Sequence, residues 1–149
     1  MIFDKLNDNL QKCNALPVLF VGTGLSRRYL DMPDWQSLLK HLANVVYPDN
    51  LYSFDHFKQI AIDELKKNNM IKNDEIPDTI LYPKIAGIID IELGEMYYTD
   101  NRFENTIETY KDDLVNGASP IKIEVVKYLK EKNKPELLNP EYTEEINLL

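Results

Sequence analysis

The chain has 149 residues, which is enough for one domain with a hydrophobic core and too few for two. Its net charge of -8 argues against duplex nucleic acid as a direct partner, because that partner favours a positive surface. Cys13 is the single cysteine, which excludes an internal disulfide, and no apolar run is long enough to cross a membrane. The opening residues mix charged with apolar side chains, so we expect no secretory signal and a cytoplasmic protein.

The first two predicted elements are an amphipathic helix and a short strand. Residues 2–13 place apolar side chains at spacings of three and four, which predicts a helix. Residues 17–21 read Pro-Val-Leu-Phe-Val, a short apolar run followed by a glycine. That run predicts a strand buried on both faces, as in a parallel sheet.

A series of helices follows. Asp34 is expected to cap the first of them, with Trp35 on its apolar stripe. Residues 70–80 are polar and predict a loop. Ser119 and Pro120 together form a typical helix start. The expected helices cover 35–46, 54–65, 82–98, 102–114 and 120–129, and another apolar pattern begins at 142.

The segment after the predicted strand carries two of the five glycines of the chain, Gly22 and Gly24, followed by Ser26, Arg27 and Arg28. Glycines at such a turn let main-chain amides approach a phosphate, and a serine and an arginine can add hydrogen bonds. Neither the dinucleotide pattern G-x-G-x-x-G nor the P-loop fits, because position 27 is arginine and no Gly-Lys-Ser/Thr follows. A tight turn with surface arginines that pair with nearby acids stays open as the other interpretation.

Residues 18–43, VLFVGTGLSRRYLDMPDWQSLLKHLA, resemble the opening motif of the sirtuin-like (silent information regulator 2-type) domains of bacteria. Gly22, Gly24 and Ser26 match its glycine motif, and Thr23 stands in place of the usual alanine. Residues 33–35, Pro-Asp-Trp, are similar to the Pro-Asp-Phe of the deacetylase branch. A weaker similarity covers residues 117–130, GASPIKIEVVKYLK.

The resemblance implies an α/β, Rossmann-like nucleotide-binding fold that binds NAD. In the anti-phage defence branch, such domains hydrolyse NAD to ADP-ribose and nicotinamide. The cofactor-binding residues that it implies here are Gly22, Thr23, Gly24, Ser26, Arg27, Asp34 and Trp35. The family's catalytic asparagine and histidine motifs do not occur in residues 1–149. We therefore expect a helix-dominated, incomplete N-terminal part of the domain, inactive by itself.

Two other readings remain open: a non-catalytic helical interaction module, and a sensor that recognises NAD or ADP-ribose without chemistry. His41 and His56 are expected to be structural, because neither has a serine or cysteine at an informative spacing. Two scattered histidines predict no metal site. Tyr97, Tyr98 and Tyr110 are expected to pack in the core. The sequence leaves a homo-oligomer open.

Overall fold

The computed structural model describes residues 32–68 and 76–132, and all regular secondary structure in these two stretches is helical. The expected Rossmann-like α/β fold is therefore wrong for this part of the chain, since no strand occurs in it. The physical reason is the spacing of the apolar residues, which bury one stripe of each helix and do not alternate across a sheet. The predicted helix at 2–13 and strand at 17–21 lie outside the described residues.

The described helices confirm most of the expected ones. Asn101–Phe103 is a 3₁₀ turn, η1. The α-helices are α3 (Trp35–Val46), α4 (Ser53–Lys67), α5 (Asp78–Met96), α6 (Glu104–Thr109), α7 (Lys111–Val115) and α8 (Pro120–Lys132). Helix α5 begins at Asp78, four residues before the expected start at 82. Residues 78–80, expected to be the end of a loop, therefore belong to this helix.

The single helix expected over 102–114 is wrong. Tyr110 has φ -111° and ψ 25°, outside the helical region, and it separates α6 from α7. No side chain caps the start of either short helix, and neither contains a buried residue. Only partly buried side chains, among them Ile107 and Leu114, hold this segment against the core, which favours two short helices over one long one.

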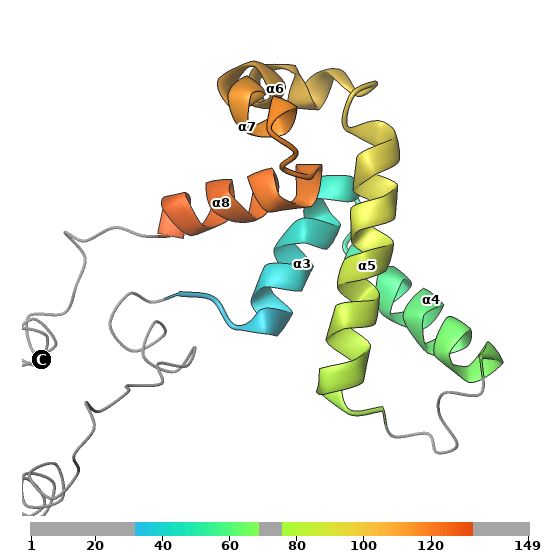
Figure 1. The fold of residues 1–149 in the computed structure, drawn as a ribbon. Coiled ribbons are helices and arrows are strands. Elements are labelled where there is room, and N and C mark those ends of the chain that lie inside the picture. Colours follow the sequence, from blue (N-terminus) through green and yellow to red (C-terminus); the bar gives the residue numbers. More distant parts are fainter. Residues whose placement is uncertain (1–31, 69–75, 133–149) are drawn as a thin grey trace, which may run out of the picture.

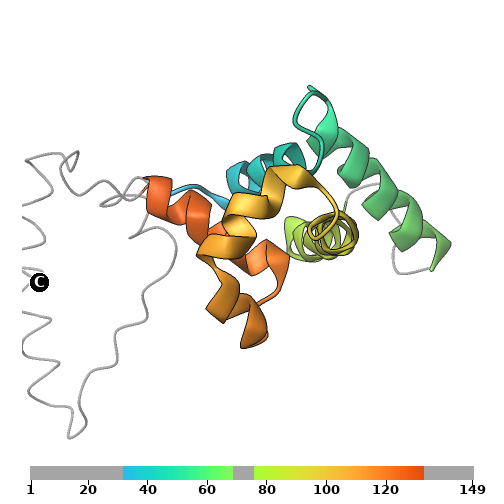
Figure 2. The same cartoon turned by 90° about the horizontal axis from the view of Figure 1, so that it is seen from above.

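Helix α5 lies at the centre of the described part and packs against α3, α4 and α8 (Figure 1). Figure 2 looks nearly along α5, with α4 on one side, α8 on the other and α3 between them. One hydrophobic cluster joins these helices, and its fully buried side chains include Leu39, Phe57, Ile85 and Leu93. The core therefore fixes the position of α3 relative to α5, and the pocket described below lies between these two helices.

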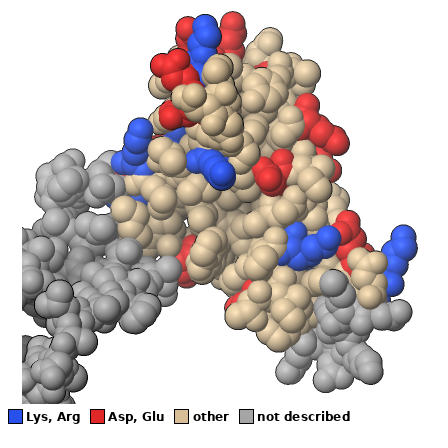
Figure 3. Space-filling view, in the orientation of Figure 1, with Lys and Arg blue, Asp and Glu red and all other residues tan. Residues whose placement is uncertain are grey.

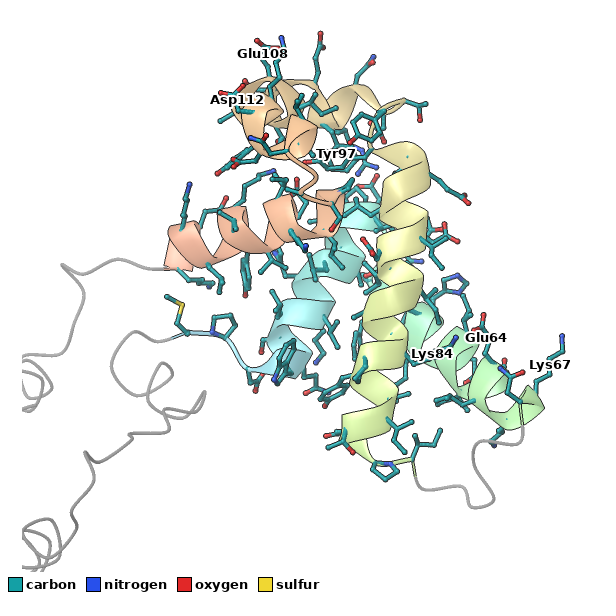
Figure 4. The ribbon with its side chains drawn as sticks, in the orientation of Figure 1. Glu64, Lys67, Lys84, Tyr97, Glu108 and Asp112 are labelled. Atoms are coloured by element: carbon teal, nitrogen blue, oxygen red, sulfur yellow. The ribbon has the colours of Figure 1, made fainter. Side chains whose placement is uncertain are left out.

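Two polar contacts tie the outer helices to this core. Arg102 of η1 donates from Nη1 to the carbonyl of Val45 at 3.1 Å and from Nη2 to that of Val46 at 3.4 Å. These carbonyls belong to the last turn of α3, where helix carbonyls lack helical partners. Lys84 of α5 forms an ion pair with Glu64 of α4 (Figure 4).

The surface carries charges of both signs. On the face shown in Figure 3, acidic and basic side chains occur in scattered groups, with a wide area of other residues between them. Glu108 and Asp112 are exposed on the outer side of α6 and α7 (Figure 4). Within the described residues, no helix is both long enough and apolar enough to span a membrane.

Candidate functional site

The start of α3 is set by Asp34, as the sequence predicts. Asp34 lies in extended backbone at φ -74° and ψ 171°, and its Oδ1 accepts a 2.7 Å hydrogen bond from the main-chain amide of Ser37. This bond satisfies one of the amides that the first turn of a helix leaves without a partner. The cap fixes the direction in which the chain enters α3 and so places Trp35, the first residue of the helix.

The expectation that Trp35 belongs to the buried stripe of α3 is wrong. Trp35 is 59% exposed, whereas Leu39, Leu42 and Val46 are each at most 2% exposed. Trp35 is the first residue of α3, and the buried side chains of this helix begin one turn later, at Leu39. Trp35 is the single tryptophan of the chain, and it lines a pocket.

This pocket lies between the start of α3 and the first half of α5 and has a volume of about 670 Å³. It is lined by Trp35, Asp78, Thr79, Tyr82, Pro83 and Ala86. Pockets for small molecules and cofactors commonly measure about 300–1,000 Å³ and combine apolar walls with a few polar groups. The size and the lining of this one are those of a ligand pocket. We call it the Trp35 pocket.

Most of the lining of the Trp35 pocket is apolar, and its polar side chains, Asp78, Thr79 and Tyr82, all come from α5. Tyr82 hydrogen-bonds to Asp78, its neighbour four residues back on α5, and the charge of Asp34 also acts on Tyr82. Burial, this hydrogen bond and both negative charges raise the pKa of the Tyr82 hydroxyl. Tyr82 therefore stays neutral and donates its hydrogen bond to Asp78.

The structure brings only two of the seven expected cofactor-binding residues near this pocket. Trp35 lines it, and Asp34 lies beside it as the cap of α3. The other five, Gly22, Thr23, Gly24, Ser26 and Arg27, lie outside the described residues. Their expected role at a phosphate stays a prediction.

The two histidines lie away from the Trp35 pocket. His41 of α3 stacks on Tyr128 of α8, with ring centroids 3.8 Å apart and planes 12° apart. His56 is exposed on α4, and its ring meets that of Tyr47 edge-on, with centroids 6.1 Å apart. Neither residue lines the Trp35 pocket. Among the described residues, no group of three or more histidine, cysteine or acidic side chains could hold a metal ion.

A second hollow of about 340 Å³ lies between α3 and the start of α4. Its lining includes Lys40, Asn44, Ser53 and Lys58, but also Asp55. Ser53 is the buried polar residue of the lining, and its hydroxyl already donates to Oδ1 of the exposed Asn44 at 2.8 Å. The Trp35 pocket is the stronger candidate for a ligand.

Reasoning from the sequence missed the half of the Trp35 pocket that comes from α5. Asp78 and Tyr82 are four residues apart and so lie on the same face of a helix. The signal that could have found them is Pro77 followed by Asp78, a typical helix start inside the stretch 70–80, which the polar pattern predicts as a loop.

Comparison with known proteins adds no relative to this description. The chain matches no protein-family model, no curated protein and no solved structure.

Proposed function

We propose that this protein binds NAD or ADP-ribose, with an aromatic ring of the ligand in the Trp35 pocket. One observation carries the proposal: an open, aromatic-walled pocket of ligand size begins nine residues after Ser26, the end of the glycine–serine motif. The motif supplies amides and a hydroxyl for a diphosphate, and the pocket supplies a surface for a base. A dinucleotide offers a group for each surface, because it has a diphosphate at its centre and a flat base at each end.

The resemblance of residues 18–43 to sirtuin-like domains extends the proposal to NAD hydrolysis during anti-phage defence. No histidine or cysteine lines the Trp35 pocket among the described residues. We therefore assign ligand binding to Trp35 and Tyr82 and assign them no catalytic role. The same proposal includes a protein that recognises NAD or ADP-ribose and catalyses no reaction.

Thermal unfolding of the full chain in the presence of NAD or ADP-ribose tests the proposal. Ligand at 100 times its dissociation constant adds about 2.7 kcal/mol to the free energy of unfolding. For a protein of this size, that raises Tm by roughly 5–10 °C. Absence of a shift with either ligand at millimolar concentration contradicts the proposal. Chromatography of the same samples detects any nicotinamide released.

Two pairs of variants locate the site. Ser26→Ala removes a hydroxyl from the motif, and Ser37→Ala removes one from the first turn of α3 while leaving the amide that Asp34 caps. We expect the shift in Tm to shrink in the first variant and to persist in the second. Trp35→Leu should also reduce it, whereas Tyr98→Leu, at an exposed ring remote from the pocket, should not.

A helical interaction module is the second candidate. Leu51 and Tyr52, adjacent in the turn between α3 and α4, are 94% and 71% exposed. Exposed neighbouring apolar side chains are typical of surfaces that contact another protein. Leu51→Ser with Tyr52→Ser would abolish such a contact and leave the ligand-induced shift in Tm unchanged.

A further inference from the structure

We infer that two copies of this chain associate through the outer face of α5, as a symmetric pair in which the two α5 helices run antiparallel. The inference goes beyond the proposed function and concerns a face of α5 other than the one that lines the Trp35 pocket. Three properties of this face carry it: exposed apolar side chains, two glycines that leave space between them, and a pair of charges at one edge.

The apolar side chains lie on the side of α5 that α3, α4 and α8 leave uncovered. Figure 2 looks nearly along α5 and shows no described helix on the side away from α3. Ile80, Ile91 and Tyr98 are 45%, 65% and 63% exposed. They share one face, because Ile80 and Tyr98 are about five turns apart, and Tyr97, after the last residue of α5, still has helical backbone. A helix at a free surface normally has a polar outer side, so an apolar one indicates a contact.

Two glycines lie on the same face between these side chains. Gly87 is about one turn before Ile91, and Gly94 is about one turn before Tyr98. A Cβ at either glycine would meet no atom within 4 Å, so the space above them is open. A second helix can approach closely there, because glycine has no side chain to hold it away. We call this face the α5 stripe; it consists of Ile80, Gly87, Ile91, Gly94 and Tyr98.

The α5 stripe is complementary to itself, which identifies a second copy as its partner. In an antiparallel pair with a twofold axis, two residues equally far from the axis on opposite sides contact each other. With the axis at the level of Ile89, Ile91 lies over the partner's Gly87, a large side chain over a gap. The same axis is midway between Ile80 and Tyr98, so each of these side chains covers the other on the partner.

The charges beside the α5 stripe obey the same symmetry. Lys84 and Glu95 are about three turns apart and so lie at the same edge of the stripe. Lys84 pairs with Glu64 of α4 (Figure 4), whereas Glu95 is exposed and forms no ion pair among the described residues. The axis is midway between Lys84 and Glu95 to within one residue, so each Lys84 meets the partner's Glu95. An ammonium has three donors and can hold Glu64 as well.

Analytical ultracentrifugation of the full chain over a wide concentration range tests the inference. One helix from each copy makes a small interface, and small interfaces give weak, reversible complexes. We expect a monomer at about 5 µM and mostly a dimer at about 500 µM. A monomer throughout this range overturns the inference, whether another segment of the chain or a different protein covers the α5 stripe.

A pair of variants locates the interface. Ile91→Glu places a charge over the partner's Gly87 and should weaken association at least tenfold. Val115→Glu is the matched control, because Val115 is 80% exposed on α7 and does not belong to the α5 stripe. It should leave association unchanged. Both substitutions add the same charge at an exposed position, so equal weakening by the two would contradict the inference.

Exchanging two charges tests the direction of the helices. Lys84→Glu puts like charges together at the partner's Glu95 and should weaken association about fivefold or more. Adding Glu95→Lys should restore association, because the exchanged charges attract again. The two positions are roughly 16 Å apart along one helix, so they do not touch within a copy. The lost pair with Glu64 is common to both variants and cancels. If the double variant associates no better than Lys84→Glu alone, the antiparallel arrangement is wrong.

Discussion

The phenol of Tyr97, at the end of α5, donates a 3.1 Å hydrogen bond to Oε1 of Glu124 in α8, 27 residues further along the chain. Glu124 is 3% exposed, and Nζ of Lys127 lies 3.0 and 2.9 Å from its two oxygens. The same Nζ reaches Oγ1 of Thr106 in α6 at 3.0 Å. One buried carboxylate thus holds α8 against α5, and its lysine joins α6 to the pair; Figure 4 shows Tyr97 at this junction.

Tyr97→Phe should lower the free energy of unfolding by about 1.5–3 kcal/mol, the usual contribution of a hydrogen bond to a charged group. The loss arises because Glu124 stays buried with one donor fewer. Urea denaturation measures the change. Tyr98→Phe is the matched control, since Tyr98 is 63% exposed, and we expect it to change stability by less than about 0.5 kcal/mol. Equal effects of the two variants would show that the bond to Glu124 adds nothing.

Asp34→Ala should destabilise the protein by about 1 kcal/mol, because it removes the acceptor for the amide of Ser37. Asp34→Asn should restore most of this loss, since asparagine is an equally good cap. Circular dichroism during thermal unfolding measures both. If Asp34→Asn proves as unstable as Asp34→Ala, the charge of Asp34 matters more than the hydrogen bond.

Replacing either glycine inside α5 by alanine should stabilise the protein by up to about 1 kcal/mol. A Cβ at Gly87 or Gly94 would meet no atom within 4 Å, so the substitution adds helix propensity without a clash. Gly117→Ala should have the opposite effect, because Gly117 has φ +92°, which strains any residue with a side chain. Chemical denaturation of the three variants measures the change in the free energy of unfolding in each. Destabilisation of all three would contradict the expectation.

The stack of His41 on Tyr128 predicts a pH dependence. Burial, the largest cause, lowers the pKa of His41; Glu131 and Glu124 counteract it, while Lys127 and Lys132 lower the pKa further. The unfolded chain therefore binds the proton of this residue more readily than the folded chain. As the pH falls below about 6.5, the ordinary pKa of histidine, the folded state loses stability relative to its value at neutral pH.

His41→Phe tests this dependence while keeping a ring on Tyr128. Between pH 7 and pH 5, the variant should lose less stability than the original chain, as measured by urea denaturation at each pH. His56→Phe, at an exposed position of α4, is the control and should follow the original chain. If His41→Phe keeps the full pH dependence of stability, groups other than His41 cause that dependence.

Helices that have a strong local signal could be predicted from the sequence. Features that depend on residues far away along the chain could not. The helix at 35–46 and its cap were predicted correctly because Asp34 and the spacing of the leucines are local features. Tyr97 was expected in the core and is buried, but Tyr98, expected there too, is exposed, since spacing does not tell which of two neighbouring rings faces α8. The break at Tyr110 left no mark in the sequence.

The Trp35 pocket could be predicted only in part. Asp34 is predictable as a helix cap, and Asp34 and Trp35 belong to the Pro-Asp-Trp match, but their neighbours on α5 are more than 40 residues away along the chain. Their approach depends on how α3 and α5 pack through Leu39 and Ile85, which no single stretch of the sequence specifies. The expected α/β fold followed from the resemblance of residues 18–43 to sirtuin-like domains, and it is wrong for the described residues, whose apolar spacing is helical.

Helix α3 is fastened at both ends, by Asp34 at the first turn and by Arg102 at the last. Its 12 residues make a rod of roughly 18 Å that cannot fray at either terminus without losing one of these contacts. Because Arg102 binds the carbonyls of Val45 and Val46, any displacement of α3 along its axis would also break these two hydrogen bonds to η1.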